Sequence, residues 1–105
     1  LHIPLNKKNL NFFSGKKFSL LKKNLILINT SRGGIVDEKY LYKFLKKNQN
    51  SYALFDVMLK EPIRDKKLLN LKNFSLTPHL AGSTVEIAEA ASTDCVKKVV
   101  KFFKK

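Results

Sequence analysis

The chain has 105 residues, 44% of them hydrophobic, which suits at most one small domain with a modest core. This content excludes a disordered chain, and a single cysteine, Cys95, excludes an internal disulfide framework. No apolar run approaches the ~18 residues of a membrane span, and the first residues lack the charged region of a signal peptide. We therefore expect a cytoplasmic protein with no membrane partner.

The formal charge of +13 comes from 21 basic residues against eight acidic ones. Such a balance is typical of proteins that bind nucleic acid or anionic membranes. The lysines, however, are paired along the whole chain, and only two basic residues are arginines, the type favoured for phosphate and base recognition. We expect no specific nucleic-acid partner, and a basic binding module remains a remote alternative.

The first third of the chain predicts a short strand end, a short helix and a buried strand. Residues 1–5 read as the last half of a strand that Pro4 stops, so we expect the chain to be truncated at its start. Ser14 is placed to cap a helix that runs to about Lys22. Residues 25–29 form an apolar run without period, which is typical of a strand buried on both faces.

Helices and strands alternate along the rest of the chain. In order, we expect a helix capped by Asp37, a strand at 52–56, a turn of helix at 66–71, a strand at 74–76 and a last helix reaching towards Phe103. Ser83 and Glu86 have the spacing of a capping box for that last helix. This alternation predicts an α/β fold with a parallel sheet and right-handed crossovers.

All strands of a parallel sheet end at one edge, which is where open α/β folds bind ligands. Thr30 and Ser31 offer hydroxyls there, Arg32 offers a fork for a carboxylate or phosphate, and Gly33 and Gly34 let the backbone approach a ligand. The ends of the other two strands add Asp56 with Glu61, and His79. We expect these side chains to converge on one crevice.

Their chemistry suits proton transfer. A histidine beside a carboxylate has the parts of a general acid/base, and Arg32 would hold a substrate carboxylate and polarise a neighbouring carbonyl. Each residue also has an ordinary interpretation: His79 as a loop or capping residue, Glu61 as a solvent-facing charge, and Asp56 as a turn cap. Taken alone, no one of them decides between the two interpretations.

Three segments in this order resemble the D-isomer-specific 2-hydroxyacid dehydrogenases: 29–38 (NTSRGGIVDE), 56–57 (DV) with 61–62 (EP), and 77–84 (TPHLAGST). Residues 1–5 (LHIPL) are similar to the family segment that precedes them, so the match covers essentially the whole chain. The resemblance implies a Rossmann-type parallel sheet with helices on both faces, present here in part. Residues 1–83 would be the C-terminal part of the NAD(P)-binding domain, and 84–105 a helix that returns towards the substrate domain.

The resemblance also assigns roles. Arg32 would bind the substrate carboxylate, Glu61 would support the histidine, and His79 would be the acid/base. Cofactor contacts would be made by Ile3, Thr30, Ser31, Arg32, Asp56, His79 and Gly82. Asp56 would lie at the nicotinamide carboxamide, with His2 and Pro4 nearby. The implied cofactor is NAD, with NADP as the alternative, and no metal is expected.

Two departures from the family limit what these residues can do alone. The Gly-x-Gly-x-x-Gly turn and the acidic residue that selects NAD over NADP are absent from the 105 residues, and Met58-Leu59-Lys60 replaces a commonly aromatic and acidic stretch. We expect the partners to be a small 2-hydroxy acid, the missing N-terminal part of the same protein and, in the intact enzyme, a second subunit or more. A non-catalytic relative that keeps the motifs without turnover remains an alternative.

Overall fold

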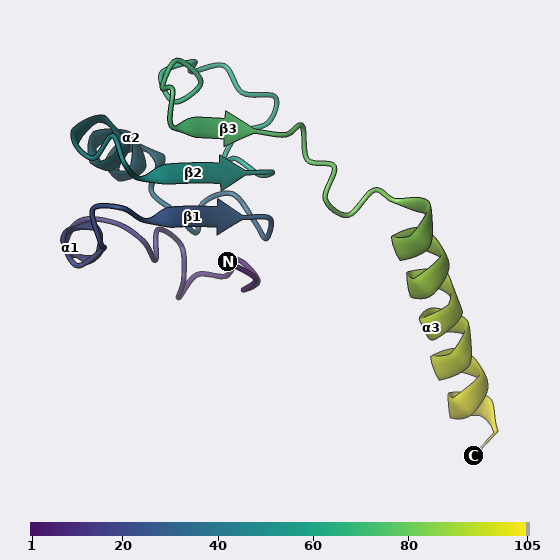
Figure 1. The fold of residues 1–105 in the computed structure, drawn as a ribbon. Coiled ribbons are helices and arrows are strands. Elements are labelled where there is room, and N and C mark those ends of the chain that lie inside the picture. The colour runs from purple at the N-terminus through teal and green to yellow at the C-terminus, as the bar shows by residue number, and fades with distance from the viewer. Residues whose placement is uncertain (105) are drawn as a thin grey trace.

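Three parallel strands form the centre of the molecule, in a computed structural model that describes residues 1–104 (Figure 1). They are β1 (Ile26–Asn29), β2 (Tyr52–Phe55) and β3 (Phe74–Leu76), in the order β1-β2-β3. Asn29 pairs with Phe55 and Phe55 with Leu76, so the three strands end side by side. The predicted parallel sheet, and the strand positions to within one residue, are confirmed.

One face of the sheet carries the core. Alternate residues of β1 and β2 are buried, and α2 (Glu38–Lys47) packs Leu41 and Leu45 against them. α1 (Lys16–Ser19) adds Phe18 to the same cluster, in which Leu27, Ala53, Phe55 and Phe74 come from the strands. As predicted, Asp37 caps α2: its carboxylate accepts hydrogen bonds from the amides of Lys39 at 2.9 Å and Tyr40 at 3.2 Å.

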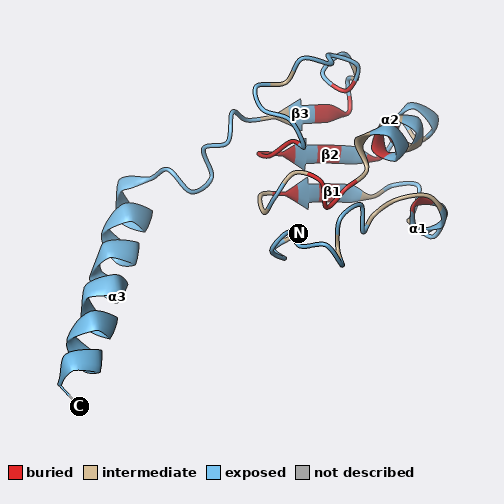
Figure 2. Cartoon of the chain, turned by 180° about the vertical axis from the view of Figure 1, so that it is seen from behind, coloured by how far each residue is buried: buried red, intermediate tan, exposed pale blue. Residues whose placement is uncertain are grey.

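The opposite face of the sheet is uncovered within the described residues (Figure 2). Ile26 is 62% exposed, Ile28 and Tyr52 are 49% and Leu54 is 41%. These apolar side chains explain why the strands read as continuous hydrophobic runs, since such runs suit a sheet covered on both sides. The part of the fold described in residues 1–104 therefore supplies the helices of one face.

α3 (Val85–Phe103) projects away from this body and has no buried residue (Figure 1). The side chain of Thr84, not of Ser83, caps it by accepting the Ile87 amide at 3.3 Å. The predicted cap was therefore wrong by one residue, because the extended backbone stops at Thr84. Lys105, the end of the predicted 84–105 segment, lies outside the described residues, and no described helix has the length and hydropathy to cross a membrane.

Three other local predictions were wrong. α1 has four residues, fewer than the helix predicted from a Ser14 cap to about Lys22, because Gly15, with a φ of +47°, takes the cap position and no side chain caps the helix. Residues 66–71 form turns without a helix, since their backbone bonds are separate ones from Asn70 to Lys66 and from Leu71 to Leu68. Residues 1–5 form no strand: the amino group of Leu1 donates to the Ile28 carbonyl at 2.6 Å, and the Leu1 side chain packs against the core.

Candidate active site

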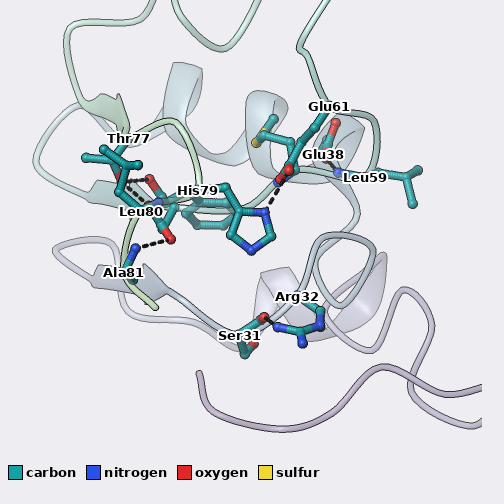
Figure 3. A network of polar contacts seen from close by, with 12 residues as sticks. Ser31, Arg32, Glu38, Leu59, Glu61, Thr77, His79, Leu80 and Ala81 are labelled. Carbon is teal, nitrogen blue, oxygen red and sulfur yellow. Dashed lines mark hydrogen bonds and ion pairs between the residues drawn. The ribbon is translucent and has the colours of Figure 1, made fainter. Parts of the chain in front are cut away.

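The candidate site lies where three loops leave the carboxyl edge of the sheet (Figure 3). The β1 loop is residues 30–34, the β2 loop is residues 56–61, and the β3 loop is residues 77–82. Because β1, β2 and β3 are parallel and in register, these loops start from neighbouring points. The residues predicted to converge are distributed over all three loops.

A buried asparagine shapes the β1 loop. The Asn29 side-chain oxygen accepts hydrogen bonds from the Ser31 amide at 3.2 Å and the Ser31 hydroxyl at 2.7 Å, and its nitrogen donates to the Arg32 carbonyl at 3.1 Å. Arg32 itself is exposed, and its guanidinium donates to the Ser31 carbonyl at 2.7 Å. Sequence reasoning did not single out Asn29, although an asparagine that ends an apolar strand is a signal for such a turn.

The two glycines of the β1 loop are required by the packing and the backbone conformation of the loop itself. A Cβ on Gly33 would overlap the carbonyl group of Met58 in the β2 loop, and Gly34 has a φ of +82°, a conformation that side chains disfavour. Gly33 therefore lets two loops of the protein pack backbone to backbone, rather than giving a ligand access. The expectation that Gly33 serves the approach of a ligand was wrong.

Asp56 joins the β2 and β3 loops. It is buried, and its carboxylate accepts hydrogen bonds from the Thr77 hydroxyl, the Leu80 amide at 2.8 Å and the Ala81 amide at 2.9 Å. The hydrogen bond from Thr77 holds the pKa of Asp56 below its usual value, with further help from the two amides, although burial acts in the opposite direction. Asp56 is thus an ionised anchor that binds the Thr77 side chain before His79 and two backbone amides after it.

His79 and Glu61 are in direct contact. The Nδ1 atom of His79 lies 2.7 Å from Oε2 of Glu61, while Oε1 of Glu61 accepts the Met58 amide at 2.8 Å. The hydrogen bond with His79 and then that from Met58 lower the pKa of Glu61, so its carboxylate stays ionised where a histidine titrates. Since Nδ1 faces Glu61, Nε2 is the ring nitrogen that can meet a substrate.

The backbone of His79 is held in an uncommon conformation. Its φ is +56°, in the left-handed region that residues other than glycine rarely adopt. Such conformations persist where the surroundings determine them, and here the Asp56 carboxylate binds the next two amides. The His79 side chain is 48% exposed and that of Glu61 37%, so the pair faces solvent.

Arg32 lies at the same edge but makes no direct hydrogen bond with the pair among the described residues. In the view of Figure 3 the His79 ring lies between Glu61 and Arg32. A cavity of about 510 Å³ adjoins the pair, lined by residues that include Asp56, Glu61, Leu76 and His79. The structure thus brings Glu61 and His79 into contact and places Arg32 on a neighbouring loop.

Of the remaining predicted cofactor residues, Thr30 and Ser31 lie on the β1 loop and Gly82 on the β3 loop. Ile3 and Gly82 are exposed, Thr30 and Ser31 are half-buried, and His2 and Pro4 are exposed beside Ile3. No atom lies within 4 Å of a Cβ added to Gly82, so a ligand can reach its backbone. The carboxylate of Asp56 accepts three hydrogen bonds of about four that a carboxylate can take, and one acceptor position is left for an amide such as that of nicotinamide.

These features fit the nicotinamide end of the cofactor that the family resemblance implies. A carboxylate acceptor, an accessible glycine backbone and two hydroxyls are suitable partners for an amide and a sugar. Within residues 1–104, no group of three or more histidine, cysteine, aspartate or glutamate side chains is arranged to hold a metal ion.

Comparison with known proteins agrees with this arrangement. Residues 1–81 match the family model described as "D-isomer specific 2-hydroxyacid dehydrogenase, NAD binding domain". The chain is 41% identical over 104 residues to D-3-phosphoglycerate dehydrogenase of Methanocaldococcus jannaschii, a match that covers 96% of this chain and 20% of that protein. It is 39% identical over 104 residues to glyoxylate reductase of Thermococcus litoralis, covering 99% of this chain and 31% of that protein.

Solved structures give the same result. An acyclic imino acid reductase in complex with NADPH and D-Arg superposes with a TM-score of 0.84 and 31% identity, covering 98% of this chain and 33% of that one. The NAD complex of a D-isomer-specific 2-hydroxyacid dehydrogenase from Lactobacillus delbrueckii ssp. bulgaricus superposes with a TM-score of 0.80 and 26% identity, covering 98% and 35%. The chain spans about a fifth to a third of the length of the curated relatives named above. It belongs to the D-isomer-specific 2-hydroxyacid dehydrogenases and matches their NAD-binding domain.

Proposed function

We propose that the protein carrying this chain is an NAD-dependent D-2-hydroxyacid dehydrogenase that interconverts a small 2-hydroxy acid and its 2-keto acid. The observation that carries the proposal is the 2.7 Å contact between His79 Nδ1 and Glu61 Oε2, at the sheet edge that also bears Arg32. A histidine oriented by a carboxylate, next to an arginine, supplies the groups needed to move a proton at a hydroxyl beside a carboxylate.

Arg32 would bind the substrate carboxylate. Its guanidinium is exposed and lies on the β1 loop, which the Asn29 side chain fixes. A planar fork with two parallel donors matches a carboxylate and sets the orientation of the neighbouring carbon. The bound acid would then present its hydroxyl or carbonyl oxygen to His79.

His79 would act as the general acid/base through Nε2. During oxidation, Nε2 would take the hydroxyl proton, and Glu61 would stabilise the imidazolium that forms. NAD, when bound, supplies the acceptor for the hydride that leaves the carbon. During reduction, the protonated ring would return its proton to the carbonyl oxygen.

The proposed contacts of the chain with the cofactor are those implied by the family: Ile3, Thr30, Ser31, Arg32, Asp56, His79 and Gly82. NADP is the alternative, because the residue that selects between the two cofactors is not among these 105. We further propose that residues 1–83 form the C-terminal part of the cofactor domain and 84–105 the helix leading to a substrate domain. A cytoplasmic protein of two or more subunits completes the proposal.

The proposed substrate is 3-phosphoglycerate, which would place the enzyme at the start of serine synthesis. Residues 62–65 and 79–84 look most like phosphoglycerate dehydrogenases, and the relative from M. jannaschii supports this choice. A glyoxylate or hydroxypyruvate reductase is the second candidate, because glyoxylate reductase of T. litoralis is almost as similar at 39% identity.

The test is a substrate panel with the whole encoded protein. We expect oxidation of 3-phosphoglycerate with NAD, and loss of that activity in the His79→Ala variant. A higher kcat/KM for the reduction of glyoxylate or hydroxypyruvate would reassign the substrate. If no 2-hydroxy or 2-keto acid is turned over with NAD or NADP, the protein is a non-catalytic relative and the proposal is wrong.

A further inference from the structure

The β2 loop must be held firmly if Glu61 is to keep its contact with His79. Val57 and Met58, in the first half of the loop, are buried, so packing fixes that half. Leu59 and Lys60 are exposed, so packing contributes much less to the half that leads into Glu61. That half needs polar contacts to hold its backbone in place.

One such contact comes from α2. Glu38, in the first turn of the helix, accepts the backbone amide of Leu59 through Oε1 at 2.6 Å (Figure 3). The neighbouring amide, that of Met58, donates to Glu61 Oε1 at 2.8 Å. Two successive amides of the loop are therefore bound by the two glutamates. Glu61 in turn contacts the His79 ring, so the position of the loop affects the position of the ring.

The β1 loop presses on the same segment, because the backbone of Gly33 packs against the Met58 carbonyl. The peptide between Met58 and Leu59 is therefore restrained twice, by Gly33 packed against its carbonyl and by the Glu38 carboxylate on its amide. The Met58 amide belongs to the preceding peptide, between the buried residues Val57 and Met58, so this restraint on the next peptide limits how far that amide and the Glu61 carboxylate bound to it can turn.

We infer that Glu38 is a positioning residue for the Glu61–His79 pair. The inference rests on the proposed function only for its effect on catalysis. The common role of an acidic residue in a first helical turn is to stabilise the helix. That role is already filled here by Asp37, which caps α2 with two hydrogen bonds.

Neighbouring residues offer a matched set of variants for the whole encoded protein. Glu38→Ala removes the acceptor for Leu59, Glu38→Gln keeps a side-chain oxygen that can accept the amide, and Asp37→Ala weakens α2 without touching the loop. Two measurements apply to all three: amide hydrogen exchange at Met58 and Leu59, and steady-state kcat and KM for the keto acid and the cofactor.

In Glu38→Ala we expect both amides to exchange faster, by about tenfold, because the hydrogen bond that closes the loop is lost. We expect kcat to fall by about tenfold to a hundredfold through misplacement of Glu61, with the KM for the cofactor nearly unchanged. Glu38→Gln should restore the slow amide exchange and the wild-type kcat. Asp37→Ala should lower the unfolding temperature and leave the exchange rates and kcat near their wild-type values.

Two results would overturn the inference. One is unchanged exchange at Met58 in Glu38→Ala; the other is an equal loss of kcat in Asp37→Ala at a matched loss of stability. If the wild-type protein turns over no keto acid, the proposed function fails, and the exchange data alone still decide whether Glu38 holds the loop.

Discussion

At the residue scale, ionised carboxylates determine the geometry of the site. Asp56 binds the amides on the far side of His79, and Glu61 binds its ring, so the histidine is fixed through both backbone and side chain. Arg32 differs from them because, among residues 1–104, its side chain is hydrogen-bonded only to the carbonyl of the preceding residue. We expect Arg32 to be free to turn towards a substrate.

This difference leads to a prediction for Arg32. Arg32→Ala should raise the KM for the keto acid and lower kcat, because the carboxylate loses its two-point contact. Arg32→Lys should not restore the activity, since an ammonium group cannot reproduce a planar pair of donors. Steady-state kinetics of both variants checks this, and a lysine variant with near wild-type kcat/KM would show that Arg32 contributes only charge.

A second prediction at this scale concerns His79. His79→Ala should reduce kcat by a factor of about 10²–10⁴, the range usual for the loss of a general acid/base. The affinity for the cofactor should fall much less than kcat, because six of the seven proposed cofactor contacts remain and the Leu80 and Ala81 amides keep their bonds to Asp56. Cofactor titration by fluorescence, set beside kcat, measures both. A kcat within a few fold of wild type would contradict the role.

At the element scale, the sheet and its connections explain most of what the sequence could predict. The apolar runs located β1, β2 and β3, because strands covered on both faces have continuous apolar sequences, and Asp37 located the start of α2 as a helix cap. The ends of α1 and α3 were misplaced, since Gly15 and Thr84 set them through backbone conformation. The contact of Glu38 with Leu59 could not be foreseen, because it depends on how α2 meets a separate loop. The contacts of Asn29 are local, and the asparagine at the strand end was the signal for them.

Asp56 gives a prediction for the link between β2 and the β3 loop. Its pKa is lowered in the folded protein, so its contribution to stability is present above the usual aspartate pKa and is lost as the pH falls through the lowered value. Asp56→Ala, which leaves buried amides unpaired, should lower the free energy of unfolding at pH 7 by about 1–3 kcal/mol.

Denaturant titrations at pH 7 and at acid pH measure this, with Asp94→Ala as the control. Asp94 lies on α3 in an exposed ion pair with Lys98, so its removal should cost little. The difference in the free energy of unfolding between Asp56→Ala and Asp94→Ala should become smaller at acid pH, where Asp56 of the Asp94→Ala variant is protonated. An equal loss of stability in both at pH 7 would show that Asp56 is no anchor.

At the scale of the whole molecule, the described residues form half of a layered arrangement. One face of the sheet is packed, while Ile26, Ile28, Tyr52 and Leu54 are exposed on the other, and α3 stands apart without a buried residue. The loops of the candidate site are nevertheless positioned from the packed side, by α2 and by the strand ends.

We therefore expect the 105-residue polypeptide alone to show no dehydrogenase turnover. It contains no Gly-x-Gly-x-x-Gly turn at a helix N-terminus to hold a diphosphate, and its open apolar face should drive self-association. Sedimentation velocity of the polypeptide and of its Ile26→Thr and Tyr52→Thr variants tests the self-association, and the variants should associate less. NAD- or NADP-dependent oxidation of 3-phosphoglycerate by these residues alone would contradict the expected lack of turnover.

The central claim is that Glu61 orients His79 for catalysis through the 2.7 Å contact between Oε2 and Nδ1. The most direct test is kcat for keto-acid reduction by the whole encoded protein, compared among the wild type, Glu61→Ala and Glu61→Gln. Glu61→Ala removes the partner of Nδ1 and the acceptor of the Met58 amide, whereas a glutamine keeps an acceptor for that amide. The account predicts that Glu61→Ala lowers kcat by about tenfold to a hundredfold and that Glu61→Gln loses less. A kcat in Glu61→Ala within a few fold of the wild type would contradict it.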